Sequence, residues 1–177
     1  MRRVSIAAVL ALTALVGLVM LSATSANEGT LSLRATLSGF QEVPPKLTDA
    51  TGTFTATING GQLNYKLTYS GLSSAPLQAH IHFGQRAVSG GIFIWLCQTA
   101  TNPAPTAGVP MCPAPGVTVT GTATAASVLK ISGQTLNAGN FGDAIAIVRS
   151  GEAYVNVHTT NFPGGEIRGQ VQFATKD

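Results

Sequence analysis

Charge is scarce in this sequence: only 10% of the 177 residues are Asp, Glu, Lys or Arg, and there are only two cysteines, three histidines and one tryptophan. So little charge excludes a disordered acidic or basic chain. It also argues against a helical bundle or coiled coil, whose exposed faces are rich in Glu and Lys. The chain instead has 45% hydrophobic residues, 20 glycines, nine prolines and many threonines, a composition typical of an all-β protein.

The first 26 residues have the pattern of a secretory signal peptide. Arg2 and Arg3 provide a positive start, an apolar run extends over residues 6–21, and small residues lead to a cleavage point after Ala26. An uncleaved anchor helix is the alternative, because the run approaches the roughly 20 residues that span a bilayer. The small residues favour cleavage, so we expect a secreted or periplasmic protein without a membrane span, and a single domain over residues 27–177.

Removal of this leader leaves eight basic and seven acidic residues, so the mature chain is almost neutral. Its Lys and Arg residues are scattered singly, whereas phosphate binding requires clusters of them. Nucleic acids and anionic membranes are therefore not expected as partners. The expected partner is an extracellular or envelope protein or ligand whose identity the sequence leaves open.

Alternating apolar and polar residues predict about eight β-strands separated by Gly/Pro turns. One polar and one apolar face on each strand predicts two antiparallel sheets packed as a β-sandwich. Residues 140–150 instead have apolar side chains at helical spacing before Gly151, which predicts one short helix. The strands are expected at residues 31–40, 53–58, 63–69, 77–83, 91–96, 117–123, 152–158 and 166–173.

Cys97 and Cys112 bracket most of residues 99–116, a segment rich in Pro, Ala, Thr and Gly that we expect to be a long surface loop. In an exported chain the two cysteines are expected to form a disulfide, and closing a loop of about 15 residues stabilises the fold by about 3 kcal/mol. A thiolate metal ligand or a redox pair is the alternative, but the spacing is not C-x-x-C.

The three histidines lie on two predicted strands. His80 and His82 share the face opposite the core-facing residues of their strand, about 7 Å apart along the backbone. On the later strand, Tyr154, Asn156 and His158 share the polar face. If the two strands are neighbours, the three imidazoles can meet and hold copper or zinc, with an open position for water or a partner.

Two interpretations without a metal remain open for these residues. The histidines can be ordinary polar-face residues, or they can form a hydrogen-bonded network with Asn156, Glu166 and Arg168 that organises loops. Glu166 and Arg168 share one face of the last strand, and we expect an exposed ion pair from them to Glu42 or to the histidines, contributing about 0–1 kcal/mol.

Three segments resemble the signature blocks of the chordin-type, or CHRD, domain family. They are GFQEVPP at residues 39–45, AHIHFG at residues 79–84, and AYVNVHT followed by PGGEIRGQ within residues 153–170. The blocks occur in family order, and the resemblance extends from about Leu31 to Phe173. It implies an immunoglobulin-like β-sandwich of Greek-key type, or a barrel, in a solitary secreted domain. The growth-factor binding of the animal antagonist chordin is not carried over to a lone domain.

A second similarity concerns residues 80–84, HIHFG, which are similar to the copper-binding strand of copper/zinc superoxide dismutase. That enzyme needs more histidines for its two metals than the three in this chain, so dismutase activity is not expected. The sequence also has no G-x-S-x-G elbow, no H-E-x-x-H helix and no EF-hand loop.

The first functional hypothesis is therefore a non-enzymatic exported binding or structural module that uses its histidine-bearing face. The alternative is a metalloprotein that binds copper or zinc through His80, His82 and His158, with redox activity; no cofactor follows with certainty. A third hypothesis, glycan binding, predicts exposed aromatic residues, and we expect Trp95, among apolar neighbours, to lie mostly in the core.

Overall fold

The computed structural model describes residues 30–174 and is an antiparallel all-β fold with one α-helix. The leader predicted at residues 1–26 lies outside the described residues. The elements are β1 (Leu31–Ser38), η1 (Gly39–Gln41), β2 (Thr51–Asn59), β3 (Gln62–Ser70), β4 (Pro76–Phe83), β5 (Gly91–Cys97), β6 (Val119–Ala123), η2 (Ala125–Ser127), η3 (Ser132–Gln134), α1 (Phe141–Arg149), β7 (Ala153–Thr159), β8 (Ile167–Gln170) and β9 (Gln172–Phe173).

The β2–β3 hairpin shows why the alternating segments become strands. Apolar residues of the two strands pair on the inner face, as Phe54 does with Leu67, and polar residues, mostly threonines on β2, alternate with them on the outer face. Gly60 and Gly61 make the turn with φ angles of 56° and 79°, which glycine adopts without steric cost. The hairpin predicted from the sequence is confirmed.

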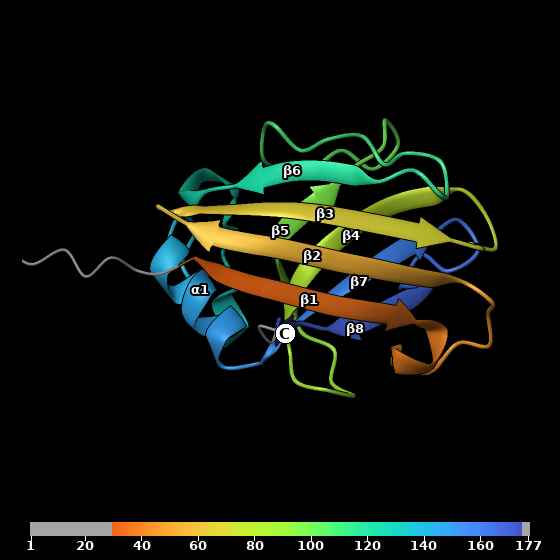
Figure 1. Cartoon of the computed structure of the whole chain (residues 1–177), viewed down its shortest axis with the longest axis horizontal. Coiled ribbons are helices and arrows are strands. Elements are labelled where there is room, and N and C mark those ends of the chain that lie inside the picture. Colours follow the sequence, from red (N-terminus) through yellow and green to blue (C-terminus); the bar gives the residue numbers. More distant parts are fainter. Residues whose placement is uncertain (1–29, 175–177) are drawn as a thin grey trace, which may run out of the picture.

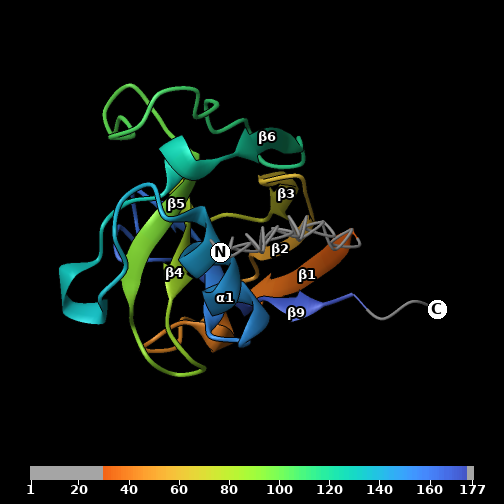
Figure 2. The same ribbon diagram turned by 90° about the vertical axis from the view of Figure 1, so that its left-hand side faces the viewer.

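The strands form one continuous sheet in the order β5-β4-β7-β8-β1-β2-β3-β6, with β9 paired to β1 (Figure 1). The sheet curls until its edges approach each other and is nearly closed, like a barrel (Figure 2). Tyr65 on β3, the neighbour of the edge strand β6, contacts the other edge, since its hydroxyl donates to the Leu96 carbonyl on β5 at 2.7 Å.

The predicted sandwich of two separate sheets is therefore not confirmed, although the antiparallel all-β class is. The difference arises at β1, which pairs with β2 along its whole length and also with β8 and β9 at opposite ends. A strand with partners on both sides joins the two halves of the sheet. Alternation along each strand is the same in a sandwich and in a curled sheet, so the sequence pattern did not separate them.

The helix α1 lies at one open end of the curled sheet and covers the core there (Figure 2). Its predicted position is confirmed: Asn140 caps the first turn by accepting from the Asp143 amide at 3.1 Å, and Gly151 follows the helix with a φ of 80°. Ala144, Ile145 and other apolar side chains of the helix are buried against the inner face of the sheet.

The predicted disulfide is present, with a Cα–Cα separation of 4.9 Å between Cys97 and Cys112. It anchors the long loop after β5, and the Tyr69 hydroxyl donates to the Pro113 carbonyl at 2.6 Å beside it. A disulfide is compatible with an extracellular or periplasmic location. Within residues 30–174, no helix has the length and apolar character needed to cross a membrane.

Candidate functional site

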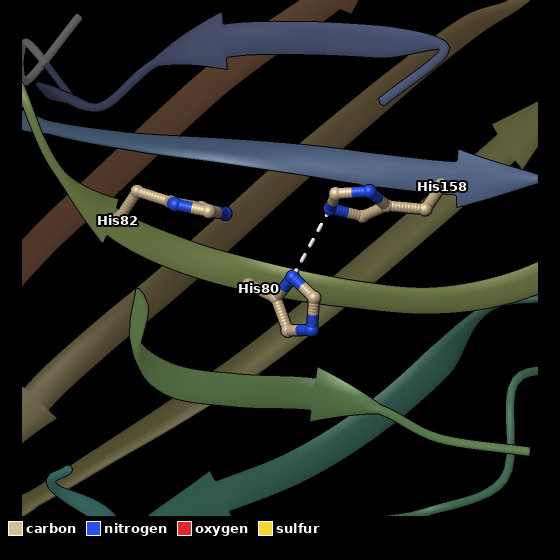
Figure 3. A group of neighbouring side chains, drawn as sticks. All are labelled: His80, His82 and His158. Atoms are coloured by element: carbon tan, nitrogen blue, oxygen red, sulfur yellow. Dashed lines mark hydrogen bonds between the residues drawn. The ribbon is translucent and has the colours of Figure 1, made fainter. Parts of the chain in front are cut away.

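The two strands that carry the histidines are neighbours. β4 and β7 pair in antiparallel fashion, with Gln78 opposite His158, His80 opposite Asn156 and His82 opposite Tyr154. The side chains of alternate residues point to the same face, so all three imidazoles leave the outer face of the sheet (Figure 3). The prediction that these strands bring the histidines together is confirmed.

The imidazole nitrogens converge on one small region. One ring nitrogen from each of His80, His82 and His158 lies within 4.8 Å of the other two. His80 Nδ1 is 3.1 Å from His158 Nε2, the contact drawn in Figure 3. Asn156 Oδ1 lies 2.9 Å from His82 Nε2 and 2.9 Å from His158 Nε2, so a carbonyl oxygen faces the same point.

Two backbone carbonyls orient the rings. His82 Nδ1 lies 3.0 Å from the Gly90 carbonyl and His158 Nδ1 lies 2.8 Å from the Pro163 carbonyl. A carbonyl accepts only, so each Nδ1 carries the hydrogen, and in a neutral ring Nε2 then has a lone pair. This arrangement, with the outer nitrogen donating to a carbonyl and the inner nitrogen bare, is the one that metal-ligating histidines use.

The histidines are buried, which differs from the expectation that they form an exposed face. His80 is fully buried, and His82 and His158 are each 6% exposed. The segments that follow β4 and β7 cover the rings, because the carbonyls of Gly90 and Pro163 lie on those segments. The prediction that the imidazoles are presented to a partner is therefore wrong. Alternation along a strand identifies the face but not the loops that cover it.

Trp95 also differs from expectation. It lies on β5 opposite His80, is half-buried, and its ring stands edge-on to the His80 ring with 4.4 Å between centroids. It therefore borders the histidine cluster instead of lying in the core. His80 Nε2 is buried without a hydrogen-bond partner among residues 30–174.

A stack of three side chains extends from the cluster to β8. The rings of His82 and Tyr154 are nearly parallel, at 7° and with centroids 4.6 Å apart, and Arg168 Cζ lies 3.4 Å from the Tyr154 ring centroid. The Tyr154 hydroxyl accepts from the Gly90 amide at 3.2 Å, and Arg168 donates to the Gln85 carbonyl at 2.8 Å. Tyr154 thus lies on the histidine face, as predicted, and Arg168 belongs to the same group.

Glu166 does not join this cluster. Its carboxylate is fully buried and accepts hydrogen bonds from Thr48, from the Ser73 amide and hydroxyl, and from Thr159, at 2.7–2.9 Å. Burial alone would raise the pKa of Glu166, but these hydrogen bonds outweigh it and lower the pKa. The predicted ion pair from Glu166 and Arg168 to Glu42 or to the histidines is wrong as to exposure, because both side chains are buried. Arg168 does interact electrostatically with Glu42, whereas Glu166 has the partners given above.

Glu42, which the sequence reasoning named only as an ion-pair partner, lies beside the cluster. It is 6% exposed, and a Cβ at Gly165 would lie 2.5 Å from Glu42 Oε1 and 2.9 Å from Asn156 Nδ2. Only glycine fits there, at a φ of 124°. Burial raises the pKa of Glu42 to about 7, opposed by the Val43 amide and by the charges of Arg168 and Lys46. Its place in the GFQEVPP block is the signal that could have identified it.

The same burial lowers the pKa of every histidine in the cluster. The pKa of His80 falls to about 2, through burial and then the neighbouring charges of His158 and His82. That of His82 falls to about 4, through burial, with the Gly90 hydrogen bond opposing it, and that of His158 is also lowered. Neutral imidazole is the form that binds metals.

The donor set fits a copper or zinc ion. Bonds of about 2.0–2.1 Å around a tetrahedral ion place ligand nitrogens about 3.3 Å apart, close to the 3.1 Å between His80 and His158. The widest separation of 4.8 Å must shorten by about 1.5 Å for the third ring to bind the same ion. Rotation of the side chains suffices for such a change, since the strands are already adjacent.

Comparison with known proteins identifies the family but no individual relative. No curated protein and no solved structure matches the chain. A family model, the CHRD domain, matches residues 33–171, which includes most of β1, the seven strands from β2 to β8, the helix and all three histidines. The chain therefore belongs to the CHRD-domain family.

Proposed function

We propose that this chain is an exported, non-enzymatic CHRD-domain protein that binds copper or zinc through His80, His82 and His158. Tyr154, Asn156 and Arg168 surround the ligands and keep them in place. Glu166, directly before β8, holds the start of that strand in place by accepting hydrogen bonds from Thr48, Ser73 and Thr159. The family assignment supports a binding module in general terms, and the buried cluster supports a metal as the bound species.

The observation that carries this proposal is a shortage of hydrogens where the side chains meet. His82 and His158 each use the Nδ1 hydrogen on a carbonyl, which leaves lone pairs at both Nε2 atoms. Asn156 Oδ1, another acceptor, is 2.9 Å from each. A hydrogen on His80 Nδ1 would satisfy only His158. Protonation of His82 would bury a charge, whereas a bound cation satisfies all of the acceptors.

The alternative is the metal-free network. Rotation of the Asn156 amide by a half-turn would direct its Nδ2 donors at the two Nε2 atoms. The cluster would then be a hydrogen-bonded support for the loops after β4 and β7. The metal content of the protein separates the two arrangements, because only one of them retains an ion.

The first experiment loads the purified mature protein with copper or zinc, removes loosely bound metal and measures the remainder by mass spectrometry. We expect about one ion per chain. In His82→Asn, the Asn amide can still donate to the Gly90 carbonyl but the Nε2 ligand is lost, so retention should fall at least tenfold. Thr57→Ala, on the exposed part of β2, is the matched control and should retain the metal. Wild-type retention at background level would refute the proposal.

Export is a separate part of the proposal. The leader pattern at residues 1–26 and the Cys97–Cys112 disulfide both support it. Expression of the full chain in a bacterial host should yield a mature protein that begins at Asn27 outside the cytoplasm. An N-terminal sequence that begins at Met1 in the membrane fraction would contradict cleavage and favour the anchor helix.

A further inference from the structure

The charge around the histidine cluster bears on which ion it takes. The cluster consists of three imidazoles and contains no carboxylate and no thiolate. Each ring is neutral when it binds a metal, so the ligands remove none of the ion's charge. A divalent ion in this site therefore retains two positive charges, and a monovalent ion retains one.

Burial makes this difference large. The three rings are between 0% and 6% exposed, so water stabilises a bound ion only weakly. The cost of transferring an ion from water into a medium of low dielectric constant increases with the square of its charge. A doubly charged ion thus has about four times the transfer cost of a singly charged ion of similar size.

The stack beside the cluster carries a positive charge, and the nearby carboxyl of Glu42 is buried, which favours its uncharged form. The Arg168 guanidinium lies against Tyr154, and Tyr154 lies against the ligand His82, so one aromatic ring separates the cation from the metal site. Arg168 is 2% exposed, which limits screening by solvent. Coulomb repulsion from it is twice as large for a divalent ion as for a monovalent one.

The number of ligands points in the same direction. Zinc in proteins is almost always four-coordinate, and divalent copper prefers a tetragonal arrangement. Either ion would need the weakly donating Asn156 Oδ1 or a water in a region where little solvent reaches. Three nitrogen ligands suffice for monovalent copper, which forms complexes of low coordination number.

We propose that the site takes monovalent copper, Cu(I), in preference to Cu(II) and Zn(II). This inference rests on the proposed function, because it requires that the three histidines bind a metal at all. It narrows that function to the retention of Cu(I) outside the cytoplasm. It also makes Arg168 a residue that sets the selectivity without touching the ion.

The test measures the affinity of the mature protein for each ion separately. Cu(I) is supplied without oxygen as its bicinchoninate complex, and Zn(II) and Cu(II) are supplied in competition with chelators of known affinity. Trp95 gives a second signal, because it is the only tryptophan and its ring is 4.4 Å from that of His80. Copper loading should quench its fluorescence in the wild type and not in His82→Asn.

We expect one Cu(I) per chain, bound at least a hundredfold more tightly than Zn(II) or Cu(II). Equal or tighter binding of a divalent ion would overturn the Cu(I) preference and leave the proposed function intact. Failure of all three ions to bind would overturn both. Both outcomes are measured on the wild-type protein, so they do not depend on whether a variant folds.

The effect of Arg168 on ion selectivity is tested by comparing two variants. Arg168→Gln removes the charge and keeps an amide that can donate to the Gln85 carbonyl, so we expect the preference for Cu(I) over Zn(II) to narrow at least fivefold. Arg34→Gln removes an exposed charge on β1 and should leave the preference unchanged. An unchanged ratio in a folded Arg168→Gln protein, judged by its circular dichroism, would refute the selectivity role.

Discussion

The outer face of the sheet has two parts with opposite environments. On β1, β2, β3 and β6 it consists of exposed Thr, Ser, Asn, Arg and Lys side chains, and one row of threonines runs across neighbouring strands from Thr36 to Thr53 and Thr68. On β4, β7 and β8 the outer residues are equally polar but buried, and they include all three histidines. The two parts belong to one sheet and show the same alternation.

The difference shows what burial does to polar residues. On the exposed part, water satisfies the hydroxyl and amide groups, so neighbouring side chains need few partners in the protein. On the buried part, each polar atom needs a partner, which explains the carbonyls of Gly90, Pro163 and Gln85 at hydrogen-bond distance. His80 Nε2 is a buried atom in this part for which residues 30–174 provide no hydrogen-bond partner.

The largest expected effect of this contrast is acid sensitivity of the metal-free protein. Each buried histidine has a lower pKa in the folded chain than its value of 6.5 in the unfolded chain. Its contribution to the free energy of unfolding is therefore complete above about pH 6.5 and is lost as the pH falls. Protonation of Glu42 stabilises the fold as the pH falls and would mask part of this effect, so the variant Glu42→Gln is used. In it we expect the free energy of unfolding to drop on the order of 5 kcal/mol between pH 7.5 and 4. Urea unfolding at several pH values measures this, and a flat profile would contradict the buried neutral rings.

Truncation of Tyr154 should cause the next largest loss of stability. Tyr154→Ala removes a ring that is 3% exposed and packs between His82 and Arg168, so we expect a loss of about 3–5 kcal/mol. Amide hydrogen exchange should become faster around Gly90 and change little in the β2–β3 hairpin. Tyr154→Phe, which keeps the ring and loses only the hydroxyl, should cost about 1 kcal/mol. Equal acceleration in both parts would show that Tyr154 supports the whole core.

Replacement of Glu42 should stabilise the fold instead of destabilising it. Its pKa is raised to about 7 in the folded chain, so the carboxyl destabilises the fold increasingly as the pH rises above 4.5. Glu42→Gln should therefore be more stable than the wild type by about 2–3 kcal/mol at pH 8 and similar to it at pH 4. Asp49→Asn, an exposed carboxyl on the same loop, is the control. A Glu42→Gln protein that is less stable at pH 8 would show that the ionised carboxylate has a partner.

The smallest effects should come from the exposed part. Single replacements of Thr53, Thr55 or Thr57 by Ala on β2 should change the free energy of unfolding by no more than about 0.5 kcal/mol, because solvent already satisfies these side chains. They should also leave metal retention unaltered. Thermal unfolding and metal analysis of the three variants measure this. A larger loss would mean that the threonine rows stabilise the sheet through cross-strand contacts.

Most of the elements could be predicted from local pattern. The β2–β3 hairpin and the helix before Gly151 follow from periodicity and turn residues, whereas the adjacency of the histidine strands β4 and β7 was only a condition of the sequence argument. The curled sheet could not be predicted, since it depends on β1 pairing with both β2 and β8, which are far apart in the sequence. Pairing between distant strands leaves no trace in the alternation of either one.

The site shows the same division. The sequence alone determined that His80 and His82 share one face of their strand and that Tyr154, Asn156 and His158 share one face of theirs, because side chains alternate along a strand. The pairing of β4 with β7, which puts the two sets on one face, was decided by the tertiary structure. Only the tertiary structure decided that this face is buried, that Glu166 is held elsewhere and that Glu42 and Trp95 lie beside the cluster. These facts depend on loops that return over the sheet, and no local periodicity specifies where a loop comes to rest.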